Sequence, residues 1–178
     1  MRVQSVDRDA SPGYGLQIRE SLICIPATGR DVLMKLLSKA CVYGIQAALL
    51  LVARHDREKY VPIRRVSEEL GISFYFLTKI LQTLTQNGIL VSYRGPNGGV
   101  ALAKSPREIS VMDVIRAIDH EDTFETCVLG LPGCGTEKPC PFHASWWEAR
   151  NRIADLFANA NLEELGQRVK DEGFRIAT

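Results

Sequence analysis

The sequence lacks any apolar run long enough to cross a membrane. Its longest apolar stretch, residues 44–53, is interrupted by Gln46, whereas a membrane-spanning helix needs about 20 consecutive apolar residues. The first nine residues already contain two arginines and two aspartates, and the N-terminus has no long apolar core that would make a secretory signal. We therefore predict a cytoplasmic protein with no membrane partner.

Motifs of the common enzyme classes are also missing. The chain has no glycine-rich nucleotide-binding motif, and it has no Ser/His/Asp or Cys/His set outside residues 127–143. Two of its three histidines, His55 and His120, are isolated. A redox enzyme that uses the cysteines is the one enzymatic alternative, and nothing outside that segment supports it. We predict that the protein is not an enzyme.

The net charge of +1 conceals an asymmetry along the chain. Residues 57–107 carry eight lysines and arginines against three acids, whereas residues 108–178 carry seven against thirteen. A basic middle beside an acidic end indicates that the middle segment faces phosphates. On charge alone, the alternative is chance clustering on a solvated surface.

Three helical patterns follow one another before residue 90. Apolar residues recur at steps of three and four over residues 36–54. A second helix opens at Pro62 and stops at Gly71, and a third begins after Ser73, a natural N-cap, and ends at Gly88. Two short helices joined by a glycine-containing turn are typical of a helix-turn-helix.

A β-hairpin comes directly after this unit. Residues 89–93 and 100–102 are predicted strands on either side of a turn rich in glycine and proline. Ser110 and Asp113 have the spacing of a capping box and start a further helix. The predicted fold class is mainly α with a small β-hairpin, a winged helix-turn-helix with a long C-terminal dimerisation helix.

The predicted organisation has four parts. Residues 34–119 form the winged helix-turn-helix DNA-binding domain, residues 120–143 the cysteine-rich loop, and residues 144–178 the dimerisation helix and a C-terminal helix. Residues 1–33 have no sustained periodicity, so we predict a disordered extension, or a non-native one if Met34 is the true start.

The DNA-contacting residues follow from the way such domains dock. The second helix of the motif enters the major groove with its N-terminal residues near base edges, and lysine or arginine side chains hold phosphates. Adjacent aromatic residues there suit sugars, thymine methyl groups or a neighbouring subunit, and an arginine at the wing tip suits the minor groove. The predicted contacts are Arg65, Ser73, Tyr75, Phe76, Thr78, Lys79, Arg94, Gly95, Pro96 and Gly98.

Three cysteines and one histidine lie within a stretch of seventeen residues near the end of the chain. Such donors can converge on one metal centre. Zinc sites usually pair cysteines two to four residues apart, and the longer gaps here favour an iron–sulfur cluster. Redox or inert thiols are the other alternative. The predicted ligands are Cys127, Cys134, Cys140 and His143.

The two other cysteines do not belong to this group. Five cysteines in a cytosolic chain favour reduced thiols or metal ligands over disulfides. Cys41 lies beside the inward face of the first helix and is predicted to be a core thiol, and Cys24 has no predicted role.

The long helix predicted after the cysteine-rich loop carries an apolar stripe of its own. Since helix-turn-helix proteins usually bind paired half-sites, we predict that this stripe packs against its twin in a homodimer. Packing within one subunit is the alternative. The predicted interface residues are Trp146, Ile153, Leu156 and Phe157.

Several of these segments together resemble the Rrf2 family of bacterial transcription regulators. They are residues 39–51 (KACVYGIQAALLL), the turn at residues 71–73 (GIS), the wing at residues 94–99 (RGPNGG) and the three-cysteine loop before Trp146. The resemblance covers residues 34–165. It implies a winged helix-turn-helix homodimer with crossing C-terminal helices, in which an iron–sulfur cluster controls DNA affinity in many members.

Within the family, the place of His143 is similar to that in the branch that regulates iron–sulfur cluster assembly. That branch binds a 2Fe–2S cluster through three cysteines and one histidine. The nitric-oxide-sensing branch instead takes an acidic ligand from the position where Val42 stands here. Thr78 replaces an acidic residue with which the cluster-assembly regulators discriminate between classes of DNA site.

The sequence thus predicts a regulator that binds double-stranded operator DNA as a homodimer. Its affinity is expected to respond to redox state, iron or nitric oxide through an iron–sulfur cluster, most simply 2Fe–2S; 4Fe–4S, zinc or no cofactor are the alternatives. Two other functions stay open on the residues alone: a cluster-free regulator that responds to a small molecule or partner protein, and a zinc-stabilised DNA-binding protein.

Overall fold

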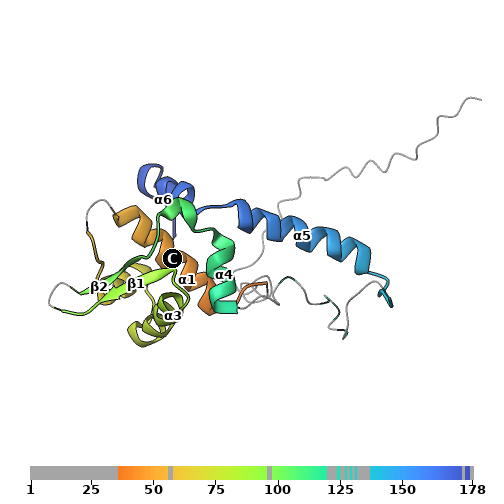
Figure 1. Cartoon of the computed structure of the whole chain (residues 1–178), viewed down its shortest axis with the longest axis horizontal. Helices are drawn as coiled ribbons and strands as arrows, with labels where there is room; N and C mark the ends of the chain where they lie inside the picture. Colours follow the sequence, from red (N-terminus) through yellow and green to blue (C-terminus); the bar gives the residue numbers. More distant parts are fainter. Residues whose placement is uncertain are drawn as a thin grey trace, which may run out of the picture.

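A computed structural model of the chain describes residues 36–55, 58–95, 98–119, 137–173 and 175–176, together with residues 124, 127, 129 and 131. The predicted N-terminal extension lies outside the described residues. The elements are α1 (Lys39–Arg54), α2 (Ile63–Leu70), α3 (Phe74–Gln86), β1 (Leu90–Tyr93), β2 (Gly99–Leu102), η3 (Pro106–Glu108), α4 (Val111–Asp119), α5 (His143–Asn159) and α6 (Leu162–Asp171), as Figure 1 shows.

The turn between α2 and α3 begins at Gly71 and ends at Ser73, as the sequence predicts. Gly71 has a φ of 64°, a left-handed conformation that glycine adopts without the steric cost of a Cβ. The Ser67 hydroxyl donates a hydrogen bond to the carbonyl of Ile72 at 2.5 Å and holds the turn closed. Ser73 occupies the N-cap position of α3, but its side chain makes no capping hydrogen bond. The predicted N-cap position of Ser73 is therefore confirmed, although its hydroxyl does not cap the helix.

The hairpin is short and is fixed to the start of α2. Strands β1 and β2 pair antiparallel, with Leu90 opposite Leu102 and Tyr93 opposite Gly99. Val61, just before α2, exchanges two backbone hydrogen bonds of 2.9 Å with Val100 of β2. The wing therefore cannot shift along the helix-turn-helix without breaking this bridge.

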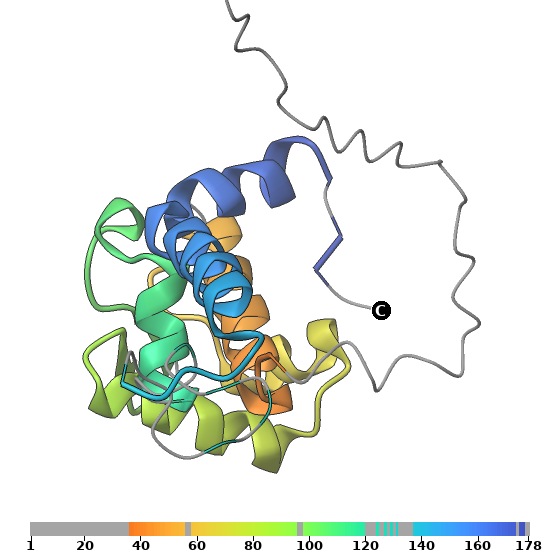
Figure 2. The ribbon, with the colours of Figure 1, turned by 90° about the vertical axis from the view of Figure 1, so that its right-hand side faces the viewer.

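The core is shared by the helix-turn-helix, the hairpin, α4 and α6. In Figure 2, α1 runs through the middle of the bundle, with α6 across one end and α3 across the other. Leu162, the first residue of α6, is completely buried. The predicted capping box at the start of α4 is confirmed, because Ser110 and Asp113 exchange side-chain to backbone hydrogen bonds of 2.8 and 3.1 Å.

Helix α5 projects from this body and then returns the chain to it (Figure 1). None of its described residues is buried. The C-terminal end of α5 is attached next to the start of α4. The Val111 amide donates to the Ala160 carbonyl at 2.8 Å, and the Leu162 amide donates to the Ile109 carbonyl at 2.9 Å. Helix α6 therefore packs on the DNA-binding unit, and the C-terminal end of α5 is attached to that unit.

Replacement of Leu162 by alanine tests how much α6 contributes to this core. Because the side chain is fully buried, we expect a loss of about 2–5 kcal/mol in the free energy of unfolding, measured by urea denaturation of apo-protein. Leu131→Ala removes the same atoms from a side chain that is 51% exposed and should cost less than about 0.5 kcal/mol. Equal losses in the two variants would contradict the packing of α6 on α1.

Candidate nucleic-acid interface and cysteine loop

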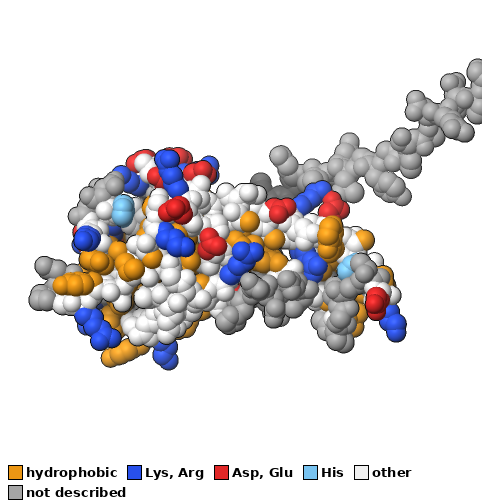
Figure 3. Space-filling view, viewed as in Figure 1, with side chains coloured by type: hydrophobic (Ala, Val, Ile, Leu, Met, Phe, Trp, Pro, Cys, Tyr) orange, Lys and Arg blue, Asp and Glu red, His pale blue; other side chains and the backbone are white. Residues whose placement is uncertain are grey.

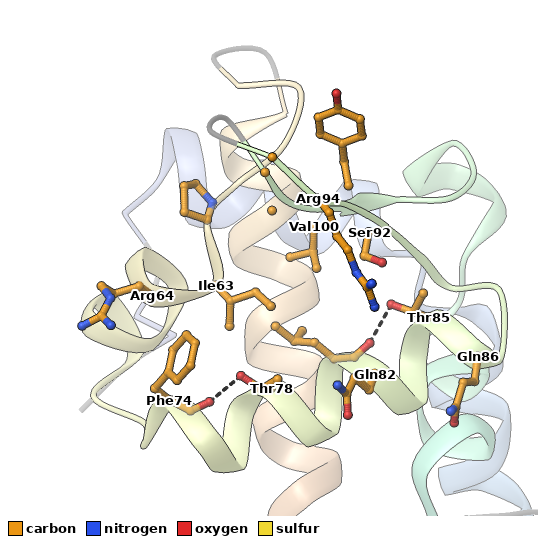
Figure 4. Close-up of a pocket in the computed structure, with 16 residues that line it drawn as sticks. Ile63, Arg64, Phe74, Thr78, Gln82, Thr85, Gln86, Ser92, Arg94 and Val100 are labelled. Carbon is orange, nitrogen blue, oxygen red and sulfur yellow. Dashed lines mark hydrogen bonds between the residues drawn. The ribbon is translucent and has the colours of Figure 1, made fainter.

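A groove of about 780 Å³ separates α3 from the hairpin and the start of α2. Figure 4 shows Arg94 reaching from the hairpin into the space above α3, while Arg64 and Phe74 lie at the other end of the groove. The floor is polar along α3. Further lining residues include Thr78, Gln82, Thr85, Gln86, Ser92 and Tyr93.

The cations at this groove have no carboxylate partners. The Arg64 guanidinium lies 5.5 Å from the centre of the Phe74 ring, and neither Arg64 nor Arg94 forms an ion pair in the part of the chain that the structure describes. In Figure 3, Lys and Arg side chains lie around the hairpin and α3 with no Asp or Glu among them, at the lower left. An anionic ligand is therefore attracted to this end of the molecule.

Arg65, which the sequence analysis assigned to phosphate binding, is held elsewhere. Its Nη1 lies 2.5 Å from Glu58 and its Nε lies 3.3 Å from Glu69. Arg54 also pairs with Glu69, at 2.6 Å. The cation that α2 presents to the groove is its neighbour Arg64. The four-residue spacing of Arg65 and Glu69 was the sequence signal that could have pointed to an internal pair.

Near the N-terminus of α3, some side chains face solvent and others contact their own subunit. Tyr75 is 80% exposed, and Lys79 is exposed as well. The Phe76 ring packs edge-on against Tyr43 of α1, with ring centres 5.9 Å apart. The Thr78 hydroxyl donates to the Phe74 carbonyl at 2.7 Å. Tyr75 and Lys79 are thus free to contact a ligand in front of the helix.

The second half of α3 contributes polar residues that the sequence analysis did not single out. Gln82 and Gln86 are exposed along the groove, and their amides can donate to phosphate or to base edges. Ser92 faces them from β1. At the wing, the Gly98 amide donates to the Gly95 carbonyl at 2.9 Å. Pro96 lies outside the described residues.

Part of the predicted ligand set is visible at the start of α5. Cys127 and Cys140 are half-buried cysteines, and Cys134 lies outside the described residues. His143 begins α5, and its backbone amide donates to the Cys140 carbonyl at 3.0 Å, so these two residues share one turn. Among the residues with a described position, no three potential ligands come together as a metal site.

Cys41 is confirmed as a core thiol. Burial raises its pKa to about 12, and the charge of Asp119 and a hydrogen bond with the Asp119 side chain act in the same direction. At neutral pH it is therefore a protonated thiol, which is not the form that ligates metals. Cys24 lies outside the described residues.

The apolar residues of α5 do not all face the same surroundings. Leu156 is 65% exposed and Trp147 is 52% exposed, and Trp146 and Ile153 are half-buried. Phe157 instead packs on the core of its own subunit, with its ring centre 6.0 Å from that of Phe124. Large exposed apolar side chains on a projecting helix mark an interaction surface.

A helix-turn-helix, a wing and an unpaired cationic groove between them define a DNA-binding transcriptional regulator, not an enzyme. Comparison with known sequences gives the family. The sequence model of the Rrf2 family, described as iron-dependent transcriptional regulators, matches residues 37–168. The chain belongs to this family.

Individual relatives agree with this assignment. The chain is 40% identical over 132 residues to the HTH-type transcriptional regulator IscR of Pectobacterium carotovorum, which covers 74% of this chain and 79% of that protein. The IscR of Photorhabdus laumondii is 39% identical over the same lengths.

Solved structures show the same fold. CymR, described as the global cysteine regulator of B. subtilis, superposes with a TM-score of 0.63 at 22% identity, over 74% of this chain and 95% of that one. The IscR of T. potens superposes with a TM-score of 0.62 at 22% identity, over 78% and 91%. In the described part of the chain, no helix has the length and apolar character that a bilayer span requires.

Proposed function

We propose that this regulator binds operator DNA as a homodimer and that a 2Fe–2S cluster, held by Cys127, Cys134, Cys140 and His143, controls its affinity. The observation that supports DNA binding is the groove between α3 and the wing. There, arginines without an acidic partner among the described residues face neutral hydrogen-bond donors. Two such grooves, related by a twofold axis, would meet two half-sites of one operator.

On the DNA, we expect α3 to enter the major groove and Arg94 to approach the minor groove beside it. The phosphate strand between the two grooves would then pass over the cavity lined by Arg64, Gln82 and Ser92. Tyr75 and Lys79, which are exposed at the start of α3, would lie nearest to the base edges. Lys79 is the only charged residue of α3, so base recognition would depend on neutral side chains and shape.

The proposed homodimer depends on α5. Its Leu156 and Trp147 remain 65% and 52% exposed among the described residues, and the helix stands away from the body over most of its length (Figure 1). A second copy with the same projecting helix offers the matching apolar stripe, as closed twofold symmetry requires. Phe157 would support this helix from inside its own subunit.

The donor set fits an iron–sulfur cluster. Thiolates and imidazole are its usual ligands, and the shared turn of Cys140 and His143 brings a thiol and an imidazole to the same end of α5. The family is described as iron-dependent. When bound, such a cluster supplies one-electron redox chemistry and iron–thiolate bonds that oxidants can break. Residues 127–143 would then form a stiffer link to α5 and set the spacing of the two recognition helices.

Anaerobic purification of the full chain tests the cluster directly. We expect a coloured protein with visible absorption and with about two irons and two sulfides per chain, and no zinc, by chemical analysis. A colourless protein that holds zinc would favour a structural metal site. A protein with neither metal that still binds operator DNA would favour a regulator controlled by a small molecule or partner protein.

A further inference from the structure

The last turn of α4 lies between the cysteine loop and the recognition helix. Residues 117–119 end the helix, and the chain continues from them directly into residues 120–143, which carry the proposed ligands. Any change in the path of that loop therefore acts first on this turn. The contacts of this turn determine which other helices the change affects.

One set of contacts leads to α3. The side-chain amide of Asn87, the C-cap of α3, donates to the Thr83 carbonyl at 2.9 Å and to the Ala117 carbonyl of α4 at 3.4 Å. Ile118 packs into the space above Gly44 of α1, where a Cβ on the glycine would overlap its Cδ1.

The same space is bounded by α3. A Cβ on Gly44 would lie 3.4 Å from Cγ2 of Ile80 and 3.7 Å from Cδ1 of Leu84. Helices α1, α3 and α4 thus meet at Gly44, and the close approach requires a residue without a side chain. A displacement of Ile118 must be accompanied by movement of α3, because close-packed interiors transmit strain.

A second set of contacts holds this turn against α1. The Ser38 backbone amide donates to Oδ2 of Asp119 at 2.7 Å, and the Cys41 thiol forms a hydrogen bond with the same side chain. At the other end of α4, Val111 is tied to the end of α5. Helix α4 is therefore held at its start by α5 and at its end by α1 and α3.

We propose that Ile118 and Asn87 are positioning residues that transmit the state of the cysteine loop to the tilt of α3. This inference rests on the proposed function, since it names how the cluster-bearing loop acts on the DNA interface. It requires that the two residues affect the difference in operator affinity between cluster-loaded and cluster-free protein. A merely structural role would change stability alone.

The coupling is measured as the ratio of operator Kd values for cluster-loaded and cluster-free protein. Each Kd is determined by fluorescence anisotropy with a labelled DNA duplex that the unmodified protein has selected from a random-sequence library. Couplings of this kind are typically about 5- to 150-fold. We expect Ile118→Val and Asn87→Ala to bring the ratio at least about threefold closer to one. Ile115→Val is the matched control, because it removes the same methyl group from a fully buried side chain of α4 and should leave the ratio unchanged.

A compensating pair provides a rescue test. The methyl group of Gly44→Ala would overlap the Cδ1 atom that Ile118→Val removes, so the shorter side chain makes room for it. We therefore expect the double variant to restore the ratio toward its original value. Because Ile118→Val, Ile115→Val and Gly44→Ala each change a single methyl group, thermal denaturation should show that these variants fold.

The outcomes separate the inference from the function on which it rests. If the unmodified protein loads a cluster and shows a ratio different from one, but Ile118→Val and Asn87→Ala leave it unchanged, the inference is wrong. The inference is also wrong if Ile115→Val changes the ratio as much, or if the double variant does not recover it. A ratio of one in the unmodified protein would overturn cluster control itself, and the coupling with it.

Discussion

Replacement of Arg64 and Arg94 together by alanine is expected to weaken operator binding about 100- to 1000-fold near physiological salt. Both arginines line the groove between α3 and the wing, and neither has an acidic partner among the described residues. In the proposed homodimer the double variant removes four charges that offset those of the phosphates: two Arg64 side chains beside the phosphate strand and two Arg94 side chains at the minor groove. At about 1 kcal/mol for each lost contact, the total approaches 4 kcal/mol.

The salt dependence identifies the contacts as phosphate contacts. Each phosphate neutralised contributes about −0.9 to the slope of log K against log salt. The double variant should therefore have a slope shallower by about 3.6 when anisotropy is measured between about 50 and 200 mM salt. A weaker complex with an unchanged slope would mean that the two side chains act through packing and not through phosphates.

Arg65→Ala is the matched control for this experiment. Arg65 adjoins Arg64 in the sequence, but its guanidinium is held by Glu58 at 2.5 Å and by Glu69 at 3.3 Å. Its replacement should change the slope by less than about 1. Arg64→Ala alone is measured beside it. If Arg65→Ala changes the slope as much as Arg64→Ala does, DNA approaches the opposite face of α2 and the groove is not the interface.

Features that depend on neighbouring residues in the sequence could be predicted from it. The capping box of Ser110 and Asp113 spans four residues, so its spacing alone is sufficient to predict it. The helix-turn-helix and the hairpin are local in the same sense. The family and the class of regulator follow from these local motifs, and the comparisons confirm both.

Contacts between distant segments could not be predicted in this way. The ion pair of Arg65 with Glu58 depends on the path of the segment between α1 and α2, and the packing of Phe76 depends on Tyr43 of α1. The hydrogen bond from Ser38 to Asp119 joins residues 81 positions apart. Sequence periodicity indicates which side chains share one face of a helix or strand. It does not show which neighbouring element that face packs against.

The candidate metal ligands stay a prediction, which rests on residue chemistry and not on geometry. The chemistry of thiolates and imidazole limits the useful residues to very few, so Cys127, Cys140 and His143 stand out without any geometry. What the structure adds is the separation of Cys41 from this group. That thiol is buried beside Asp119 with a raised pKa of about 12, and it provides the internal control that the cluster proposal needs.

Replacement of any one of Cys127, Cys134 or Cys140 by alanine is expected to abolish the visible absorption of the anaerobically purified protein. Three thiolates and one imidazole leave no spare ligand, and a cluster that loses one thiolate has no other described cysteine to take its place, because Cys41 is a buried, protonated thiol. Cys41→Ala makes the same chemical change outside the site. It should retain the full spectrum and iron content, at some cost in stability.

The His143 position distinguishes the proposed ligand set from an all-cysteine one. An imidazole ligand raises the reduction potential of a cluster relative to thiolate, so His143→Cys should keep the colour and lower the potential in an anaerobic redox titration. A histidine that only begins α5 would give no such shift. If the cysteine variants lose the cluster and the operator Kd then becomes independent of iron loading, the ligands and the regulatory input are the same residues. If the Kd still responds to iron, the input lies elsewhere in the protein, and the cluster proposal is wrong.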